Sequence, residues 1–174
     1  MWVIALMFSI VFVDRITKVA AFHFLKHQDP VVLILRLLEF RYAENTGAAW
    51  SMLSGYQWIL IAISLVMLSI LVFFAKTLWR CGFWGKLAFG LLVSGIVGNL
   101  ADRILYRYVI DFIQVYIGSY PFPIFNIADM AICLGGAAYV ITSLRGEKSS
   151  PSSGEGVPEG WGSGQNNERG TSKG

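Results

Sequence analysis

The sequence predicts a membrane all-α protein with four transmembrane helices and a small β-sheet at the membrane surface. Of its 174 residues, 55% are hydrophobic and only 14% are charged, which is far from the balance of a water-soluble domain. A helix needs about 20 apolar residues to cross a bilayer. Stretches of that kind lie near residues 2–24, 58–79, 86–105 and 124–144.

The first stretch, 2–24, stands where a secretory signal peptide would stand. It lacks a basic start and a small-residue cleavage pattern, and it carries Asp14, Arg15 and Lys18, so we expect a retained helix. Asp14 and Lys18 are four residues apart and can pair on one helix face. Two interpretations stay open: a structural ion pair, or a Lys18 that reaches the headgroup level and positions a substrate or lipid.

The segment 25–56 predicts strands rather than a plain loop. Residues 31–35 and 37–42 are rich in β-branched, leucine and aromatic side chains, and turn-forming residues bound them at 29–30 and 45–47. We therefore expect a small sheet on the membrane surface.

The distribution of Lys and Arg predicts the orientation in the membrane. Basic residues without acidic ones occupy the connection at 76–86, and further basic residues open the C-terminal segment at 145–148. Such clusters favour the cytoplasmic side. This places both termini in the cytoplasm and the segments 25–56 and 106–123 on the outer face.

Residues 1–145 are predicted to form one membrane domain, followed by a tail at 146–174. The tail is rich in Gly, Ser, Glu and Asn and nearly lacks aliphatic residues, which predicts a disordered cytoplasmic segment. The net charge of +3 comes without basic and aromatic residues in alternation, so a nucleic-acid partner is not expected.

Several catalytic schemes find no support in the sequence. Cys81 and Cys133 lack a CxxC or Cys/His neighbourhood, and His23 and His27 do not form an HExxH pattern. No serine lies in a GxSxG context. These absences argue against metal-dependent, thiol and serine chemistry and predict no cofactor.

Two polar motifs lie near the ends of apolar segments. In the first, Asn45 offers an amide, Gly47 a free backbone and Ala49 little bulk, which suits either a surface turn or a binding surface. In the second, Asn99 shares one side of a helix end with Asp102 and Arg103. We expect Asp102 and Arg103 to form a structural ion pair.

Asp111 and Asp129 are the candidate catalytic residues. Asp111 has no cation within two residues, so desolvation should raise its pKa above about 3.9. Asp129 follows Asn126 on the same helical face, and Pro123 suits the start of that helix. Two carboxyls brought together can share a proton, so that one activates water while the other donates to a carbonyl oxygen. The alternative is two unrelated carboxylates at the interface.

Taken together, five motifs resemble those of the bacterial lipoprotein signal peptidases, or signal peptidase II. They are DRITK at 14–18, NTGAAWS at 45–51, GNLADR at 98–103, VIDF at 109–112 and FNIAD at 125–129. They follow the order of that family across four spans. Two departures are Ser94 and Arg107, which stand near positions where the family often has glycine.

The resemblance implies an aspartyl endopeptidase of the bacterial inner membrane, with its active site near the periplasmic face. It would cut the signal peptide from prolipoproteins whose cysteine carries a diacylglyceryl group, with those prolipoproteins and membrane lipid as partners. The implied fold is a four-transmembrane-helix bundle with a small periplasmic β-sheet cradle. Catalysis would fall to Asp111 and Asp129. The supporting or substrate-binding residues would be Asp14, Lys18, Asn45, Gly47, Ala49, Asn99, Asp102, Arg103 and Asn126.

Two other classes compete with a peptidase. Intramembrane carboxylates also mark ion and proton paths, so a small transporter or channel subunit is one alternative. A non-catalytic scaffold, in which Asp102 and Arg103 only hold helices together, is another. Neither alternative accounts for two carboxyls in separate asparagine-containing motifs.

Overall fold

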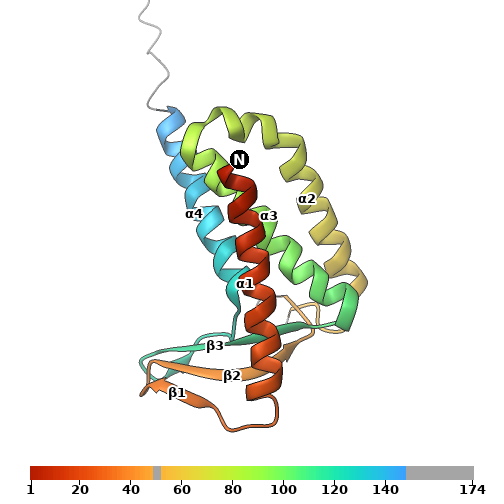
Figure 1. Ribbon diagram of the computed structural model, residues 1–174, viewed down its shortest axis with the longest axis vertical. Coiled ribbons are helices and arrows are strands. Elements are labelled where there is room, and N and C mark those ends of the chain that lie inside the picture. Colours follow the sequence, from red (N-terminus) through yellow and green to blue (C-terminus); the bar gives the residue numbers. More distant parts are fainter. Residues whose placement is uncertain (49–51, 148–174) are drawn as a thin grey trace, which may run out of the picture.

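The computed structural model describes residues 1–48 and 52–147, so the predicted site residue Ala49 and the tail from 148 lie outside the described residues. Along the described chain, a helix is followed by two strands, two helices, two strands and a last helix (Figure 1). Their order is α1 (Trp2–Leu25), β1 (Val31–Ile34), β2 (Leu38–Asn45), α2 (Gln57–Arg80), α3 (Gly82–Tyr106), β3 (Val109–Ile117), β4 (Tyr120–Pro121) and α4 (Ile127–Glu147).

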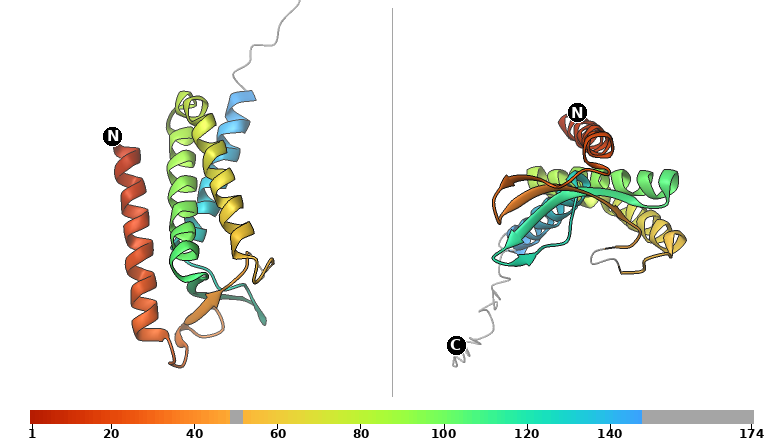
Figure 2. Two further views of the ribbon diagram at one scale, coloured as in Figure 1. Left: turned by 90° about the vertical axis from the view of Figure 1, so that its right-hand side faces the viewer. Right: turned by 90° about the horizontal axis from the view of Figure 1, so that it is seen from below.

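Helix α3 lies at the centre and packs against α1, α2 and α4. Figure 2 shows α1 on one side of α3, with α2 and α4 on the other. Small residues permit this close approach. A Cβ atom added at Gly95 would lie 2.4 Å from the carbonyl oxygen of Ala128, so α3 and α4 are in contact almost backbone to backbone there.

Three of the described helices, α2, α3 and α4, are long and apolar enough to cross a membrane. Helix α1 has the same length as α2, 24 residues. It differs in carrying the charged side chains of Asp14, Arg15 and Lys18 near its middle. The structure is thus mostly helical, with three candidate spans and a small antiparallel sheet.

The sheet lies across one end of the helices (Figure 1) and has the strand order β1-β2-β3-β4, with antiparallel pairs throughout. Strands β1 and β2 lie where the sequence predicts them. Strand β3 runs through the 106–123 connection, for which the sequence patterns predict no strand. Its first four residues, 109–112, are all buried, so they lack the alternation of polar and apolar residues that marks a half-exposed strand.

Helix α4 begins at Ile127, three residues later than the sequence predicts. Phe125 forms an isolated antiparallel bridge with Ile113 of β3, and this pairing keeps the chain extended beyond Pro123. Pro123 therefore precedes the sheet contact and does not start the helix, contrary to the expectation. The bridge brings the start of α4 against β3.

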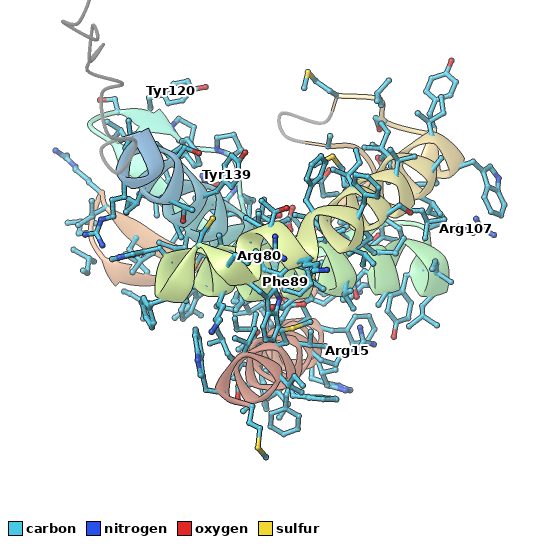
Figure 3. All side chains as sticks on the ribbon, turned by 90° about the horizontal axis from the view of Figure 1, so that it is seen from above. Arg15, Arg80, Phe89, Arg107, Tyr120 and Tyr139 are labelled. Atoms are coloured by element: carbon cyan, nitrogen blue, oxygen red, sulfur yellow. The ribbon has the colours of Figure 1, made fainter. Side chains whose placement is uncertain are left out.

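The basic clusters of the sequence gather at the end of the bundle away from the sheet. The N-terminus of α1, the α2–α3 connection and the end of α4 all lie at that end (Figure 1). Figure 3 views the molecule from this end, with Arg80 near the middle of the projection. The basic connection at 76–86 and the start of the C-terminal segment are thus on one side, and the sheet is on the other.

Arg107 ends α3 in a conformation that favours glycine. Its φ of 68° is left-handed, and its N–H donates to the carbonyl of Arg103. A side chain in this conformation costs about 1–2 kcal/mol. The guanidinium lies 4.2 Å from the ring centroid of Trp58 at the start of α2 (Figure 3), and this cation–π contact offsets part of the cost.

Candidate active site

Asp111 is placed by β3 and Asp129 by the first turn of α4. Asp111 pairs with Ala43 of β2 in the sheet register and is buried. Burial, and then the negative charge of Asp129, raise the pKa of Asp111 from its ordinary 3.8 to about 7. Asp129 is therefore close enough to Asp111 to influence its ionisation.

Asp129 and Asn126 form a reciprocal cap at the start of α4. The backbone N–H of Asp129 donates to Oδ1 of Asn126 at 2.9 Å, and the backbone N–H of Asn126 donates to Oδ2 of Asp129 at 3.2 Å. This is the geometry of a capping box, with Asn and Asp in place of Ser and Glu. The candidate carboxylate is thus part of the helix end, where the helix dipole favours a negative charge.

Three asparagines from three parts of the chain hold the two carboxylates. Asn126 and Asn45 donate their side-chain N–H groups to the two oxygens of Asp111, at 2.6 and 3.0 Å. Asn99 of α3 donates to Oδ1 of Asp129 at 2.7 Å. With the backbone contact of the cap, every oxygen of both carboxylates accepts an N–H.

Gly47 and Arg103 connect the end of β2 to α3. The N–H of Gly47 donates to Oδ1 of Asn45 at 2.9 Å, and Nη2 of Arg103 donates to the carbonyl of Gly47 at 3.1 Å. The positive charge of Arg103 also acts on both Asp111 and Asp129. Nε of Arg103 is buried without a hydrogen-bond partner among the described residues.

A buried ion cluster lies directly behind the asparagines. Lys18 Nζ is 2.8 Å from Asp14 Oδ2 and 2.9 Å from Asp102 Oδ2, and Arg15 Nη1 is 2.8 Å from Asp102 Oδ1. The predicted pairing of Asp14 with Lys18 is confirmed. Lys18 is fully buried, so the alternative in which it reaches the headgroups is wrong.

The predicted pairing of Asp102 with Arg103 is also wrong. The ion pairs of Asp102 are with Arg15 and Lys18 on α1. Consecutive residues on a helix point in different directions, so Asp102 faces α1 while Arg103 faces the loop at Gly47. The sequence had no signal for these partners, because they lie on another helix.

The arrangement can support acid–base chemistry. One carboxyl with a raised pKa lies beside another that accepts two N–H donors at a helix start, which is how paired carboxyls take separate roles as acid and base. Among residues 1–48 and 52–147, no group of three or more His, Cys, Asp or Glu side chains is arranged to hold a metal ion.

Comparison with known proteins gives one consistent family. A sequence profile described as "Signal peptidase (SPase) II" matches residues 6–145. The chain is 38% identical to the lipoprotein signal peptidase of Clostridium tetani over 136 residues, which cover 78% of this chain and 87% of the relative. Identity to the lipoprotein signal peptidase of Vibrio cholerae is 37% over 123 residues, covering 68% and 72%.

Solved structures agree with the sequence matches. A bacterial membrane enzyme determined by the in meso method at 2.3 Å resolution superposes with a TM-score of 0.78 at 32% identity, covering 88% of this chain and 93% of that one. A second, determined at 1.9 Å, gives a TM-score of 0.73 at 33% identity, covering 82% and 92%.

Proposed function

We propose that this chain, which belongs to the signal peptidase II family, is an aspartic endopeptidase that cleaves prolipoproteins before their diacylglyceryl-modified cysteine. The observation that carries the aspartic mechanism is a pair of carboxyls that accept hydrogen bonds from the same group of asparagines. Asp111 and Asp129 come from separate elements and are held by the same asparagine, Asn126.

The two carboxyls would take different roles. Asp129, at the start of α4, acts as the base and accepts a proton from a water molecule, whose oxygen attacks the scissile carbonyl carbon. Asp111, protonated near neutral pH because burial and its neighbour raise its pKa to about 7, donates its proton to the carbonyl oxygen. When the tetrahedral intermediate collapses, the C–N bond breaks and the proton held by Asp129 passes to the leaving amine. Asp111 regains its proton from the hydroxyl of the intermediate.

All four helices would span the bacterial inner membrane, α1 included. The charges of α1 do not oppose this, because Asp14 and Lys18 pair with each other inside the protein and Arg15 pairs with Asp102. Residues 1–145 then form one membrane domain. The basic end of the bundle faces the cytoplasm, and the sheet forms a cradle at the periplasmic face.

The substrate would reach the carboxyls from the membrane. Its diacylglyceryl chains stay in the lipid while the peptide before the modified cysteine enters between Asp111 and Asp129. The turn at Asn45 and Gly47 lies beside Asp111, and the lack of a side chain at Gly47 would help to admit the lipid-bearing segment. Membrane lipid would thus take part in substrate binding and would also surround the protein.

Cleavage by the purified protein in detergent tests the proposal. A diacylglyceryl-modified prolipoprotein should be cut in the presence of a chelator, and the unmodified form should not. Asp111→Asn and Asp129→Asn should abolish cleavage, whereas the matched change Asp29→Asn, at an exposed site outside the network, should not. Cleavage that survives both substitutions in the pair would refute the aspartic mechanism.

A further inference from the structure

We propose that Lys18 is a positioning residue for both reacting carboxyls, through three hydrogen-bonded arms that radiate from its buried ammonium. The inference rests on the proposed function, because it says which residue keeps the catalytic carboxyls of Asp111 and Asp129 in position. It concerns a side chain that touches neither carboxyl by hydrogen bond or ion pair.

The ammonium of Lys18 has one acceptor for each of its three protons. Its distances are 2.8 Å to Asp14 Oδ2, 2.9 Å to Asp102 Oδ2 and 3.1 Å to Asn99 Oδ1. The side chain is 0% exposed. A buried cation that lost one of these partners would not find water in its place, so its position is strongly fixed.

The first arm sets the orientation of the Asn99 amide. An ammonium only donates hydrogen bonds, so the amide oxygen of Asn99 must face Lys18. The amide nitrogen must then face away, and it donates to Asp129 Oδ1 at 2.7 Å. Asn126 Nδ2 donates to the same Asn99 oxygen at 3.2 Å, which reinforces this orientation. An Asn99 amide turned the other way would present an oxygen to a carboxylate.

The other two arms end on the backbone beside each carboxyl. Asp14 binds Lys18 with one oxygen, and its other oxygen accepts the N–H of Ala128 at 2.9 Å. Ala128 directly precedes Asp129. Asp102 Oδ2 binds Lys18 and also accepts the N–H of Ile110 at 3.4 Å, and Ile110 directly precedes Asp111. Every arm therefore ends on a reacting residue or on its neighbour.

Lys18 also affects the ionisation of the pair. Arg15 and Lys18 together balance the charges of Asp14 and Asp102, so loss of Lys18 leaves one uncompensated negative charge. The charges that act on Asp111 are those of Asp129, Arg103 and Lys18, and its hydrogen-bond donors are Asn45 and Asn126.

The charge of Lys18 lowers the pKa of Asp111, against the larger effects of burial and of Asp129. Its removal should raise that pKa further. The alkaline limb of the pH–rate profile, where Asp111 loses its proton, should then move to higher pH.

The first test compares two Lys→Met changes, one at Lys18 within α1 and one at Lys26, which directly follows α1. Lys18→Met should lower kcat by about 10²-fold, as expected for displaced catalytic groups, with little change in KM, and should move the alkaline limb upward. Lys26→Met removes an ion pair of the same length, 2.9 Å to Glu44, at a partly exposed site, and should stay within about twofold of wild type. An unchanged kcat and pH profile in a folded Lys18→Met protein would overturn the proposal.

A second comparison separates positioning from charge balance. In Asp14→Asn combined with Lys18→Met, the remaining Asp102 and Arg15 balance each other, so yield and thermal midpoint should recover relative to Lys18→Met. The kcat should stay low relative to Asp14→Asn alone, which keeps Lys18. Recovery of kcat in the double variant would show that Lys18 only balances charge and would overturn the positioning role.

A crystal structure of the double variant gives a readout that does not depend on activity. The Asn99 amide should leave its position beside Asp129, and an Asn99 amide still hydrogen-bonded there would contradict the proposal. If the wild-type protein fails to cleave the modified prolipoprotein, the proposed function fails, while this structural result still decides the role of Lys18.

Discussion

The half of the bundle next to the sheet adds a buried polar network to close helix packing, whereas the half farther away is held by close packing of small residues. Near the sheet, the buried charged and amide side chains include Asp14, Lys18, Asn99, Asp102, Asp111 and Asn126. Farther away, the close contacts involve glycines: a Cβ at Gly85 would lie 2.1 Å from the carbonyl of Leu78, and one at Gly135 2.8 Å from Cγ of Leu92. Packing brings helices together, and polar contacts fix particular atoms.

The two halves should respond differently to substitution. Buried polar groups that water does not reach need all their hydrogen-bond partners. A network that loses one member therefore leaves its other members without partners. Packed small residues need only space. A change in the polar half should therefore affect chemistry, and also stability where it leaves a charge unpaired, whereas a change in the packed half should affect stability alone.

The largest effect expected is loss of turnover in the polar half with the fold retained. Asp111→Asn and Asp129→Asn keep the size of the side chain but remove the proton acceptor or donor. Each should lower kcat by at least about 10³-fold, at the upper end of acid–base contributions. The elution of the protein in size-exclusion chromatography in detergent should stay the same as for wild type. Near-normal cleavage by either variant would remove that residue from the mechanism. It would also contradict the expectation that substitutions in the polar half affect chemistry.

A pH dependence of stability should come from Asp111. Its pKa is about 7 in the folded protein and near 3.8 when unfolded, so between these values the folded state holds a proton that the unfolded chain releases. Stability should therefore fall as pH rises from about 4 to 7, by up to about 1.4 kcal/mol per pH unit.

Thermal midpoints in detergent at pH 5 and pH 8 measure this slope, and Asp111→Asn should flatten it. Glu44 has the opposite sign, because its hydrogen bond from Lys26 lowers its pKa below 4.5. The stability that Glu44 contributes is present above pH 4.5 and is lost as pH falls through its lowered pKa, outside this window. An equal slope in Asp111→Asn would assign the dependence elsewhere.

Adjacent glycines test the packed half. Gly135→Ala places a Cβ 2.8 Å from Leu92 Cγ and 2.9 Å from its backbone nitrogen, and this overpacking should cost about 1–3 kcal/mol of stability. Gly136→Ala meets nothing within 4 Å and should cause no loss. Thermal midpoints give the comparison, and equal effects at the two positions would contradict close α3–α4 packing as the stabilising feature.

The smallest effect expected comes from one donor at the edge of the polar half. Asn45→Ala removes the 3.0 Å hydrogen bond to Asp111 Oδ2, which lowers the pKa of Asp111. The alkaline limb of kcat/KM should shift upward. The rate on the plateau below that limb should fall by up to about tenfold, because one hydrogen bond that positions Asp111 is lost. A lower rate with an unmoved limb would indicate that Asn45 acts on the substrate instead.

The helices and the first two strands could be predicted because their signals are local. Hydropathy over a long window marks α2, α3 and α4, and β-branched residues mark β1 and β2. Strand β3 was not predicted, because both of its faces are buried at Val109–Phe112. Its sequence therefore lacks the alternation of polar and apolar residues that indicates a strand. The delayed start of α4 escaped because Phe125 pairs with a strand that was itself not predicted.

The candidate site was predictable as a set of residues but not as a set of contacts. Asp111 and Asp129 attract notice because carboxylates near hydrocarbon are costly. The partner of Asp102 could not be read from its neighbours, since it lies on α1. Lys18 and Asn99 are 81 residues apart, and nothing in either local pattern indicates their contact.

Asn126 is hydrogen-bonded to both carboxyls. Its side-chain nitrogen donates to Asp111 Oδ1, and its backbone N–H donates to Asp129 Oδ2. Its side-chain oxygen accepts the backbone N–H of Asp129, so the size of this one residue helps to set the spacing of the pair. An amide plane does not stretch, and a longer side chain such as glutamine would change that spacing by a full methylene. The dimensions of Asn126 therefore affect the room that the two carboxyls leave for a water molecule and a scissile bond.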